Sequence, residues 1–176
     1  MSPLGQLDAS PRGPVLAVQG ANTQASSGSS SAGSTSSTNP DQQYRSLQNQ
    51  LCILNDTAAK EEVRLKAAQE LSDNLDVAIA SPHYQQFLDC GLRVFLKVLK
   101  ELPNHSIAEY SNQQTRKLVL EMIQRLPAND YLKPHARDIL VLMFKLLEYE
   151  NEENVLVCLR IIIEPVSYTH LRAHET

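Results

Sequence analysis

Three apolar helical patterns follow one another almost without a linker between Gln113 and Glu164. The segment contains the runs QQTRKLVLEMIQRLP, KPHARDILVLMFKLLEYENEEN and VLVCLRIIIE. None of these helices could bury its apolar residues alone, so each needs a neighbour on at least one side. The series predicts an all-α fold, a HEAT-like α-solenoid fragment of antiparallel helix pairs. Proteins with this architecture mostly hold other proteins rather than perform chemistry.

The chain before this segment shows the same helical spacing. Asn39-Pro40 predicts a helix start, because Asn caps a first turn and Pro is tolerated at the first helical position. This helix would bury Tyr44, Leu47, Leu51 and Leu54. We expect Asp56 or Thr57 to cap the next helix, which has acidic residues in its first turn. Its buried face would hold Val63, Ala67, Leu71, Leu75 and Ala78.

Prolines divide the middle of the chain. Ser81-Pro82 predicts a break, followed by a short helix and a tight joint at Gly91, beside which Cys90 would pack. A second helix would then bury a stripe and end at Pro103, because the residue before Pro is pushed out of helical conformation. That stripe is Leu92, Phe95, Leu96, Leu99 and Leu102. Ser111 is the predicted N-cap of the next helix, which carries Leu118, Met122, Ile123 and Leu126 and stops at Pro127.

The last two predicted helices are the most apolar. Asn129 or Asp130 would open an element that is apolar around most of its circumference, which predicts burial between neighbours on both sides. Its apolar residues are Ile139, Leu140, Val141, Leu142, Met143, Phe144, Leu146 and Leu147. Asn151 would cap the final helix. A truncated solenoid leaves its last helix without a neighbour, so the isolated chain is expected to self-associate through Leu156, Leu159 and Ile163.

Three helical segments also occupy comparable places in the predicted pairs. They begin near Glu62, Thr115 and Asn154. Their separations, about 52 and about 38 residues, bracket the period of roughly 40–47 that is typical of HEAT or armadillo repeats. Unrelated amphipathic helices in a bundle remain the alternative.

Composition narrows the classes of function. A net charge of −4 gives no electrostatic case for binding nucleic acid. The acidic run Glu148–Glu153 is interpreted as a solvated helix junction. The three cysteines lack zinc-ligand spacing and favour reduced thiols in the cytosol or nucleus. No apolar window is long enough to span a membrane.

No catalytic, cofactor-binding or metal-binding residues are predicted. The sequence lacks phosphate-binding glycine motifs, a zinc-protease motif and a nucleophile elbow. His83 and His135 follow or adjoin prolines near helix starts, where exposed polar residues are ordinary. Asp138 could share a face with His135, but we interpret them as a surface pair rather than an acid–base dyad. We therefore expect no enzyme activity, no cofactor and no small-molecule substrate.

Two runs carry a resemblance to a known family. Gln113–Asp130 and Phe144–Glu164 resemble the TRRAP/Tra family of giant pseudokinase-bearing adaptors, and Leu65–Leu75 and Ser81–Leu88 fit the same region more loosely. The resemblance covers about residues 41 to 164. It implies an N-terminal piece of a HEAT-repeat solenoid, far from the kinase-like domain. It also implies a nuclear scaffold for transcription coactivation, whose partners are histone acetyltransferase complex subunits and transcription activators.

These observations predict three parts. Residues 1–39 are rich in Ser, Gly and Pro and are expected to be disordered. Residues 40–164 form the HEAT-like helical segment. Residues 165–176 resemble a translated cloning adapter and are expected to be non-native, so His170 and His174 carry no function. Two alternatives for function remain open: a generic HEAT or armadillo adaptor in transport or a phosphatase scaffold, and a helical accessory region of an active phosphatidylinositol-3-kinase-like kinase.

Overall fold

The computed structural model describes residues 39–102 and 110–166. The predictions for the N-terminal tail, for residues 103–109 and for most of the adapter-like end lie outside these ranges. The described residues are helical, without strands. The elements are α1 (Pro40–Asn55), α2 (Glu61–Asp73), α3 (Leu75–Ala80), α4 (Tyr84–Glu101), α5 (Tyr110–Arg125), the 3-10 turn η1 (Lys133–His135), α6 (Ala136–Leu146), α7 (Glu152–Ile161) and the π-turn η2 (Ile162–Val166).

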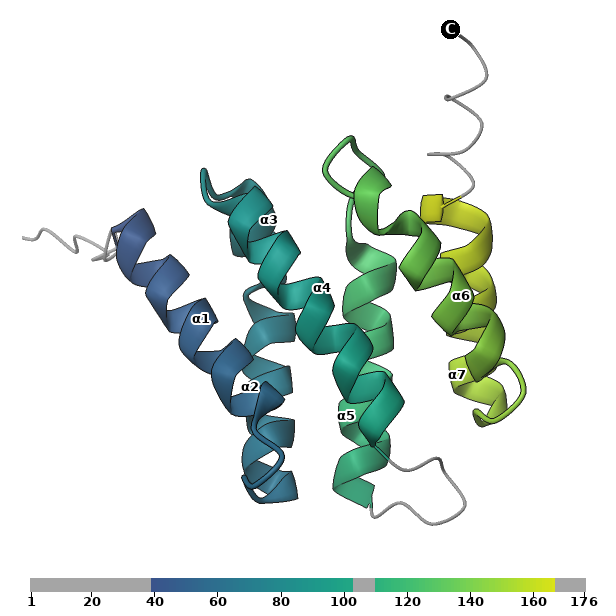
Figure 1. The fold of residues 1–176 in the computed structure, drawn as a ribbon. Helices are drawn as coiled ribbons and strands as arrows, with labels where there is room; N and C mark the ends of the chain where they lie inside the picture. The colour runs from purple at the N-terminus through teal and green to yellow at the C-terminus, as the bar shows by residue number, and fades with distance from the viewer. Residues whose placement is uncertain (1–38, 103–109, 167–176) are drawn as a thin grey trace, which may run out of the picture. The chain divides into compact units, whose positions relative to one another are not determined.

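The helices pack as successive pairs, α1 with α2, α4 with α5 and α6 with α7. Figure 1 shows α1, α4 and α6 on the near side of the stack, with α2, α5 and α7 behind them. Helix α2 also packs on α5, and α5 on α7, so the second helices carry the stack from one pair to the next. This arrangement confirms the predicted all-α, solenoid-like fold. None of the helices described is long and apolar enough to cross a membrane.

The first helix forms as its sequence predicts. The side chain of Asn39 accepts a hydrogen bond from the backbone N–H of Asp41 at 3.1 Å, and Pro40 occupies the first helical position. Leu47, Leu51 and Leu54 are buried in one continuous core with residues of α2, α4 and α5. Helix α4 ends at Glu101, and the backbone of Leu102 is extended before Pro103, as expected.

The predicted joint at Gly91 is wrong. Helix α4 runs unbroken from Tyr84 to Glu101, because its buried residues keep one helical period through Gly91. A methyl group at Gly91 would lie 3.7 Å from Phe87 and 3.8 Å from Leu51, which is ordinary contact distance. The glycine therefore lies in the packed face between α4 and α1 and bends nothing. Cys90, predicted to be packed, is exposed.

Two predicted N-caps are also wrong. Asp56 ends α1 and accepts a hydrogen bond from the N–H of Ala58 at 2.9 Å, while α2 begins only after Lys60, which makes no side-chain cap. Ser111 lies inside α5, because that helix already includes Tyr110. Asp56 fails as a cap because its side chain satisfies a local turn instead of the helix N-terminus.

Burial also departs from the prediction on α2 and α6. Val63 is exposed, and its neighbour Arg64 points into the interior instead. On α6, Ile139, Leu142, Met143 and Leu146 are buried, but Val141 is 64% exposed and Phe144 is 55% exposed. Helix α6 is therefore buried on one side and not between neighbours on both sides.

Candidate partner-binding surface

Each second helix of a pair carries a buried polar residue in its first half. These residues are Arg64 on α2, Arg116 on α5 and Asn154 on α7. They lie at the separations of about 52 and about 38 that the sequence predicts for equivalent positions of a helical repeat. In the first pair, Nε of Arg64 donates to the carbonyl oxygen of Leu54, near the end of α1, at 3.0 Å. A helix end leaves such carbonyl groups without helical partners, so Arg64 supplies a missing donor.

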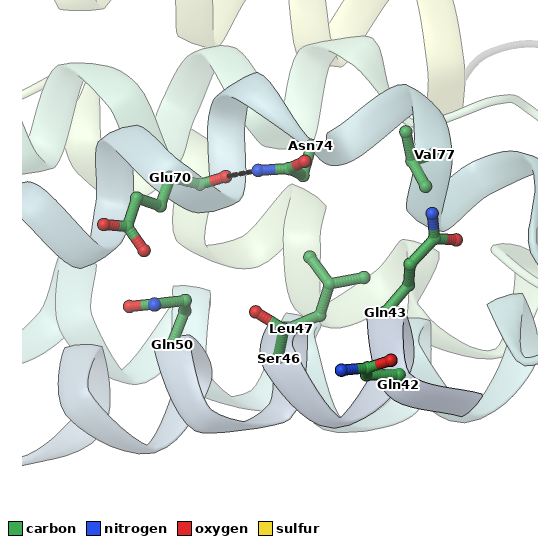
Figure 2. Close-up of a pocket in the computed structure, with 8 residues that line it drawn as sticks. All are labelled: Gln42, Gln43, Ser46, Leu47, Gln50, Glu70, Asn74 and Val77. Carbon is green, nitrogen blue, oxygen red and sulfur yellow. Dashed lines mark hydrogen bonds between the residues drawn. The ribbon is translucent and has the colours of Figure 1, made fainter. Parts of the chain in front are cut away.

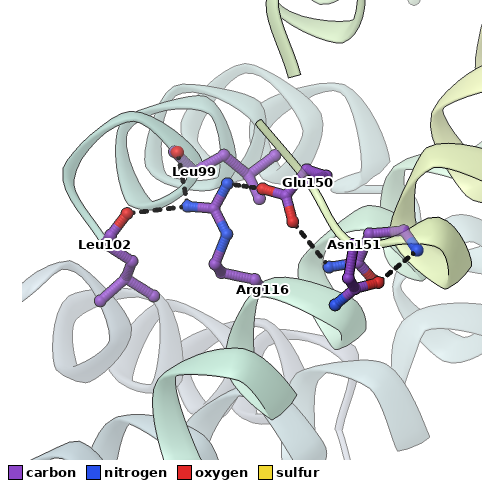
Figure 3. A network of polar contacts seen from close by, with 6 residues as sticks. Leu99, Leu102, Arg116, Glu150 and Asn151 are labelled. Atoms are coloured by element: carbon purple, nitrogen blue, oxygen red, sulfur yellow. Dashed lines mark hydrogen bonds and ion pairs between the residues drawn. The ribbon is translucent and has the colours of Figure 1, made fainter. Parts of the chain in front are cut away.

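Arg116 makes the corresponding contact in the second pair. Its guanidinium donates to the carbonyl oxygens of Leu99 and Leu102, at the end of α4, at 2.8 and 2.9 Å (Figure 3). It also forms an ion pair with Glu150, which follows α6 in the chain. The two side chains are 3% and 1% exposed, so water screens this pair very little. The pair ties the second helix pair to the third.

Glu150 was predicted to be a solvated residue of the acidic run, and this is wrong. Its second carboxylate oxygen accepts a hydrogen bond from the side chain of Asn154 at 2.9 Å. Asn151 caps α7 as predicted, by accepting from the N–H of Asn154 at 2.9 Å. The junction between α6 and α7 is therefore anchored in the interior, and its acidic neighbours Glu152 and Glu153 face outward from the first turn of α7.

Burial changes the pKa values at this joint. Desolvation lowers the pKa of Arg116 from its ordinary value. Desolvation also raises the pKa of the Cys158 thiol to about 11, and the nearby positive charge of Arg116 opposes that rise. Cys158 is fully buried, whereas Cys52 and Cys90 are exposed, and all three are free thiols.

Both histidines singled out in the sequence hold helices together. His83 lies 2.8 Å from a carboxylate oxygen of Asp41 and stacks on Tyr44 with ring centroids 4.9 Å apart. His135 pairs with Asp89 of α4 at 2.9 Å and not with Asp138, the partner suggested by spacing. Within the described ranges, no three His, Cys, Asp or Glu side chains gather as metal ligands would.

A polar hollow lies between α1 and the α2–α3 segment. Its volume is about 340 Å³, and amide side chains dominate its lining (Figure 2). The side chain of Asn74 is already engaged, because it donates to the carbonyl oxygen of Glu70 at 2.8 Å. The lining residues are Gln42, Gln43, Ser46, Leu47, Gln50, Glu70, Asn74 and Val77.

A second depression, which we name the α4–α6 groove, combines apolar and basic residues. It consists of two adjoining hollows of about 210 and about 230 Å³, which share Lys100, Leu142 and Lys145. The hollow of about 210 Å³ is lined by residues of α4 and α6 and by residues just after these helices: Leu99, Lys100, Leu102, Leu142, Lys145, Leu146 and Tyr149, with Arg116 beneath. Asp138 and Val141 complete the far end. Sequence reasoning missed this groove because its residues meet only when α4 and α6 lie together.

The third pair leaves large apolar side chains uncovered. Leu156, Leu159 and Ile163 are 56%, 38% and 66% exposed, which confirms the predicted exposure of these three side chains. The self-association that this exposure favours stays a prediction. Light scattering tests it: a monodisperse monomer that binds no hydrophobic dye would contradict it.

Comparison with known proteins identifies relatives for most of the chain. A stretch of 118 residues, 67% of this chain, is 48% identical to Transcription-associated protein 1 of Drosophila melanogaster. A stretch of 114 residues is 47% identical to the human Transformation/transcription domain-associated protein. The yeast SAGA complex/NuA4 acetyltransferase complex subunit TRA1 is 28% identical over 107 residues. The chain spans about 3% of the length of each of these relatives.

No family model and no solved structure matches the chain. The relatives are members of the family that Gln113–Asp130 and Phe144–Glu164 resemble. Over about two thirds of its length, this chain is homologous to the TRRAP/Tra family of transcription-associated proteins.

Proposed function

We propose that this chain is a non-catalytic scaffold segment of a nuclear transcription coactivator. Its partners would be subunits of histone acetyltransferase complexes and transcription activators. The observation that carries the proposal is its 47–48% identity to proteins named for transcription, together with a more distant relative named as a SAGA and NuA4 subunit. The stacked helix pairs support a scaffold, because they present an extended surface assembled from many short elements.

The mechanism of such a segment is geometric. Helix pairs that pack on one another fix the relative positions of their loops and outer faces, and partners bind where those faces combine. The buried Arg116–Glu150 pair suits this role, because it holds adjacent pairs in one relation. The interior described here is filled by side chains, and the hollows between helices are modest in size.

Affinity purification of the full-length gene product from nuclear extract tests the proposal. We expect acetyltransferase subunits to co-purify. Recovery of transport receptors or phosphatase subunits alone would favour the generic adaptor. The sequence of the remaining gene tests the third possibility, because a kinase-like domain with intact catalytic and metal-binding aspartates would favour an accessory region of an active kinase.

A further inference from the structure

The polar hollow between α1 and the α2–α3 segment, which we name the amide hollow, lies between two facing rows of side chains. Figure 2 shows the two rows in opposite chain order: Gln43, Leu47 and Gln50 of α1, and Glu70, Asn74 and Val77 of the α2–α3 segment. Leu47, in the middle, is buried, whereas Gln43 and Gln50 at the two ends are half-buried. The amides of α1 therefore stand above an apolar centre.

The amide groups of the hollow have free hydrogen-bonding capacity. Within the described ranges, no hydrogen bond reaches the side chain of Gln43 or Gln50. The side chain of Asn74 donates to the carbonyl oxygen of Glu70 and keeps its own oxygen available. A side-chain amide offers one carbonyl acceptor and an NH2 donor, which are the two groups that a peptide bond carries. Each amide can therefore pair with the main chain of another segment.

The spacing of the amides suits an extended chain. Gln43 and Gln50 are seven residues apart, which is about 10.5 Å along a helix axis. Three residues of an extended chain span about 10 Å. The volume of about 340 Å³ exceeds the roughly 300 Å³ at which small-molecule pockets begin, but such pockets are mostly apolar. Here two of the eight lining residues are apolar, so the hollow fits a short polar main chain better.

The charge of the hollow selects a basic residue. Glu70 is the charged residue among those that line it. In the part of the chain that the structure describes, its carboxylate forms no ion pair, although Lys66 lies one turn earlier on α2. The described lining residues include no Lys or Arg, so the phosphates of a nucleic acid would find no counter-charge there. A Lys or Arg of a bound segment would place its cation beside Glu70.

We propose that the amide hollow binds an extended, basic peptide segment of a partner protein. Gln43 and Gln50 would pair with peptide groups of that segment, and Glu70 would hold its Lys or Arg side chain. The residues beside the basic one would be small, because the amides must reach the main chain. This inference rests on the proposed scaffold function, because it names the class of segment that one end of the scaffold would hold.

Nuclear magnetic resonance tests the hollow with the whole 176-residue chain. The probe is the synthetic peptide GSSKSSG with blocked ends, and the side-chain NH2 signals of glutamine follow its binding. We expect the signals of Gln43 and Gln50 to shift. Q43A/Q50A should weaken binding by about tenfold, because two hydrogen bonds are lost, and Ala preserves the helix. The matched control Q48A/Q69A, which truncates exposed glutamines outside the hollow, should bind as the unaltered chain does.

A charge exchange tests the basic residue. E70K should weaken binding of the lysine peptide several-fold and should strengthen binding of a peptide with Glu in place of the lysine, GSSESSG. E62K, which makes the same change at an exposed residue outside the hollow, should alter neither affinity. The exchange separates a specific ion pair from a loss of folding, because an unfolded variant would gain no affinity for either peptide.

Three results would overturn the inference. They are unmoved signals of Gln43 and Gln50 at saturating peptide, an equal loss of affinity in Q48A/Q69A, and equal affinity of the unaltered chain for the two peptides. A failed peptide titration with successful recovery of acetyltransferase subunits would reject the amide hollow and leave the coactivator function standing. Peptide binding that meets every expectation, without recovery of those subunits, would reject the coactivator function and leave the hollow standing.

Discussion

Arg64 and Arg116 make the same kind of contact in two successive helix pairs, but only one of them is part of an ion pair. Each extends from the second helix of its pair to a carbonyl group at the end of the first. In the part of the chain that the structure describes, Arg64 has no carboxylate partner. One nitrogen of each guanidinium, Nη2 of Arg64 and Nε of Arg116, is buried without a hydrogen bond. Arg116 has Glu150, which comes from the third pair.

The two arginines therefore have different structural roles. Arg64 completes a helix end inside one pair, and its loss would affect mainly that helix end. Arg116 completes a helix end and also fixes the next pair through Glu150 and Asn154. A buried ion pair adds little net stability compared with apolar residues, but it requires both partners to be present and correctly placed. We call the contact between the second and third helix pairs, made by Arg116, Glu150 and Asn154, the second joint. It is therefore expected to be more sensitive to single substitutions than the contact that Arg64 makes within the first pair.

The largest expected effect comes from Arg116→Met. This change leaves the carboxylate of Glu150 buried without its partner and removes the donor from the carbonyls of Leu99 and Leu102. We expect a loss of about 3–5 kcal/mol in the free energy of unfolding, measured by urea denaturation with circular dichroism. Adding Glu150→Leu should recover part of the loss, since it removes the unpaired charge but not the missing donor. A loss below that of Arg64→Met would contradict the comparison.

Cys158 offers a probe of the second joint with a smaller effect. The thiol is buried and its pKa is raised to about 11, so it should react with a thiol reagent much more slowly than Cys52 and Cys90. In Arg116→Met we expect the slow reaction to accelerate by about tenfold or more, because opening of the joint exposes the thiol. Arg64→Met should leave this rate unchanged. Equal acceleration in both variants would show that the two joints open together.

The same thiol predicts a pH dependence. Its pKa in the folded chain lies above the ordinary value of 9.0. Folding therefore favours the protonated thiol, and this contribution is fully present below pH 9 and declines as the pH rises from about 9 towards 11. Cys158→Ala should flatten the unfolding free energy across that window, whereas Cys52→Ala should not.

Arg64→Met should cost less, about 1 kcal/mol in the same urea experiment. One carbonyl group loses its donor, but the substitution also removes a buried guanidinium that has an unsatisfied nitrogen. The two effects oppose each other. A cost equal to that of Arg116→Met would mean that an unrecognised partner holds Arg64.

The positions of most helices were predictable, whereas the joints were not. The structure divides the helix predicted over Val63–Ala78 into α2 and α3, and it keeps α4 unbroken through Gly91. Apolar spacing, Asn39, Asn151 and Pro103 act within one turn of the chain, so the sequence alone locates them. Whether Val63 or Arg64 turns inward depends on a carbonyl group of the preceding helix, which periodicity does not register. Glu150 lies in an acidic run that is otherwise exposed, and its partner is on another helix.

The candidate groove was hidden for the same reason. Lys100 and Lys145 each lie at an ordinary position, the last turn of a helix, where a lysine needs no further explanation. They line one hollow only because the ends of α4 and α6 lie side by side (Figure 1). A sequence pattern predicts which face of a helix is apolar, but the neighbours decide which polar residues share a surface.

The smallest expected effects concern the two asparagine caps. Asn39 caps α1 at an exposed end of the stack, whereas Asn151 caps α7 beside Glu150 and Asn154. We expect Asn39→Ala to cost about 0.5 kcal/mol and Asn151→Ala about 1 kcal/mol, both within the range for lost caps. The difference should shrink when Glu150→Gln is added, because the cap and the ion pair share Asn154. If the two caps cost the same in every background, Asn151 acts on its own helix alone and the second joint has no wider network.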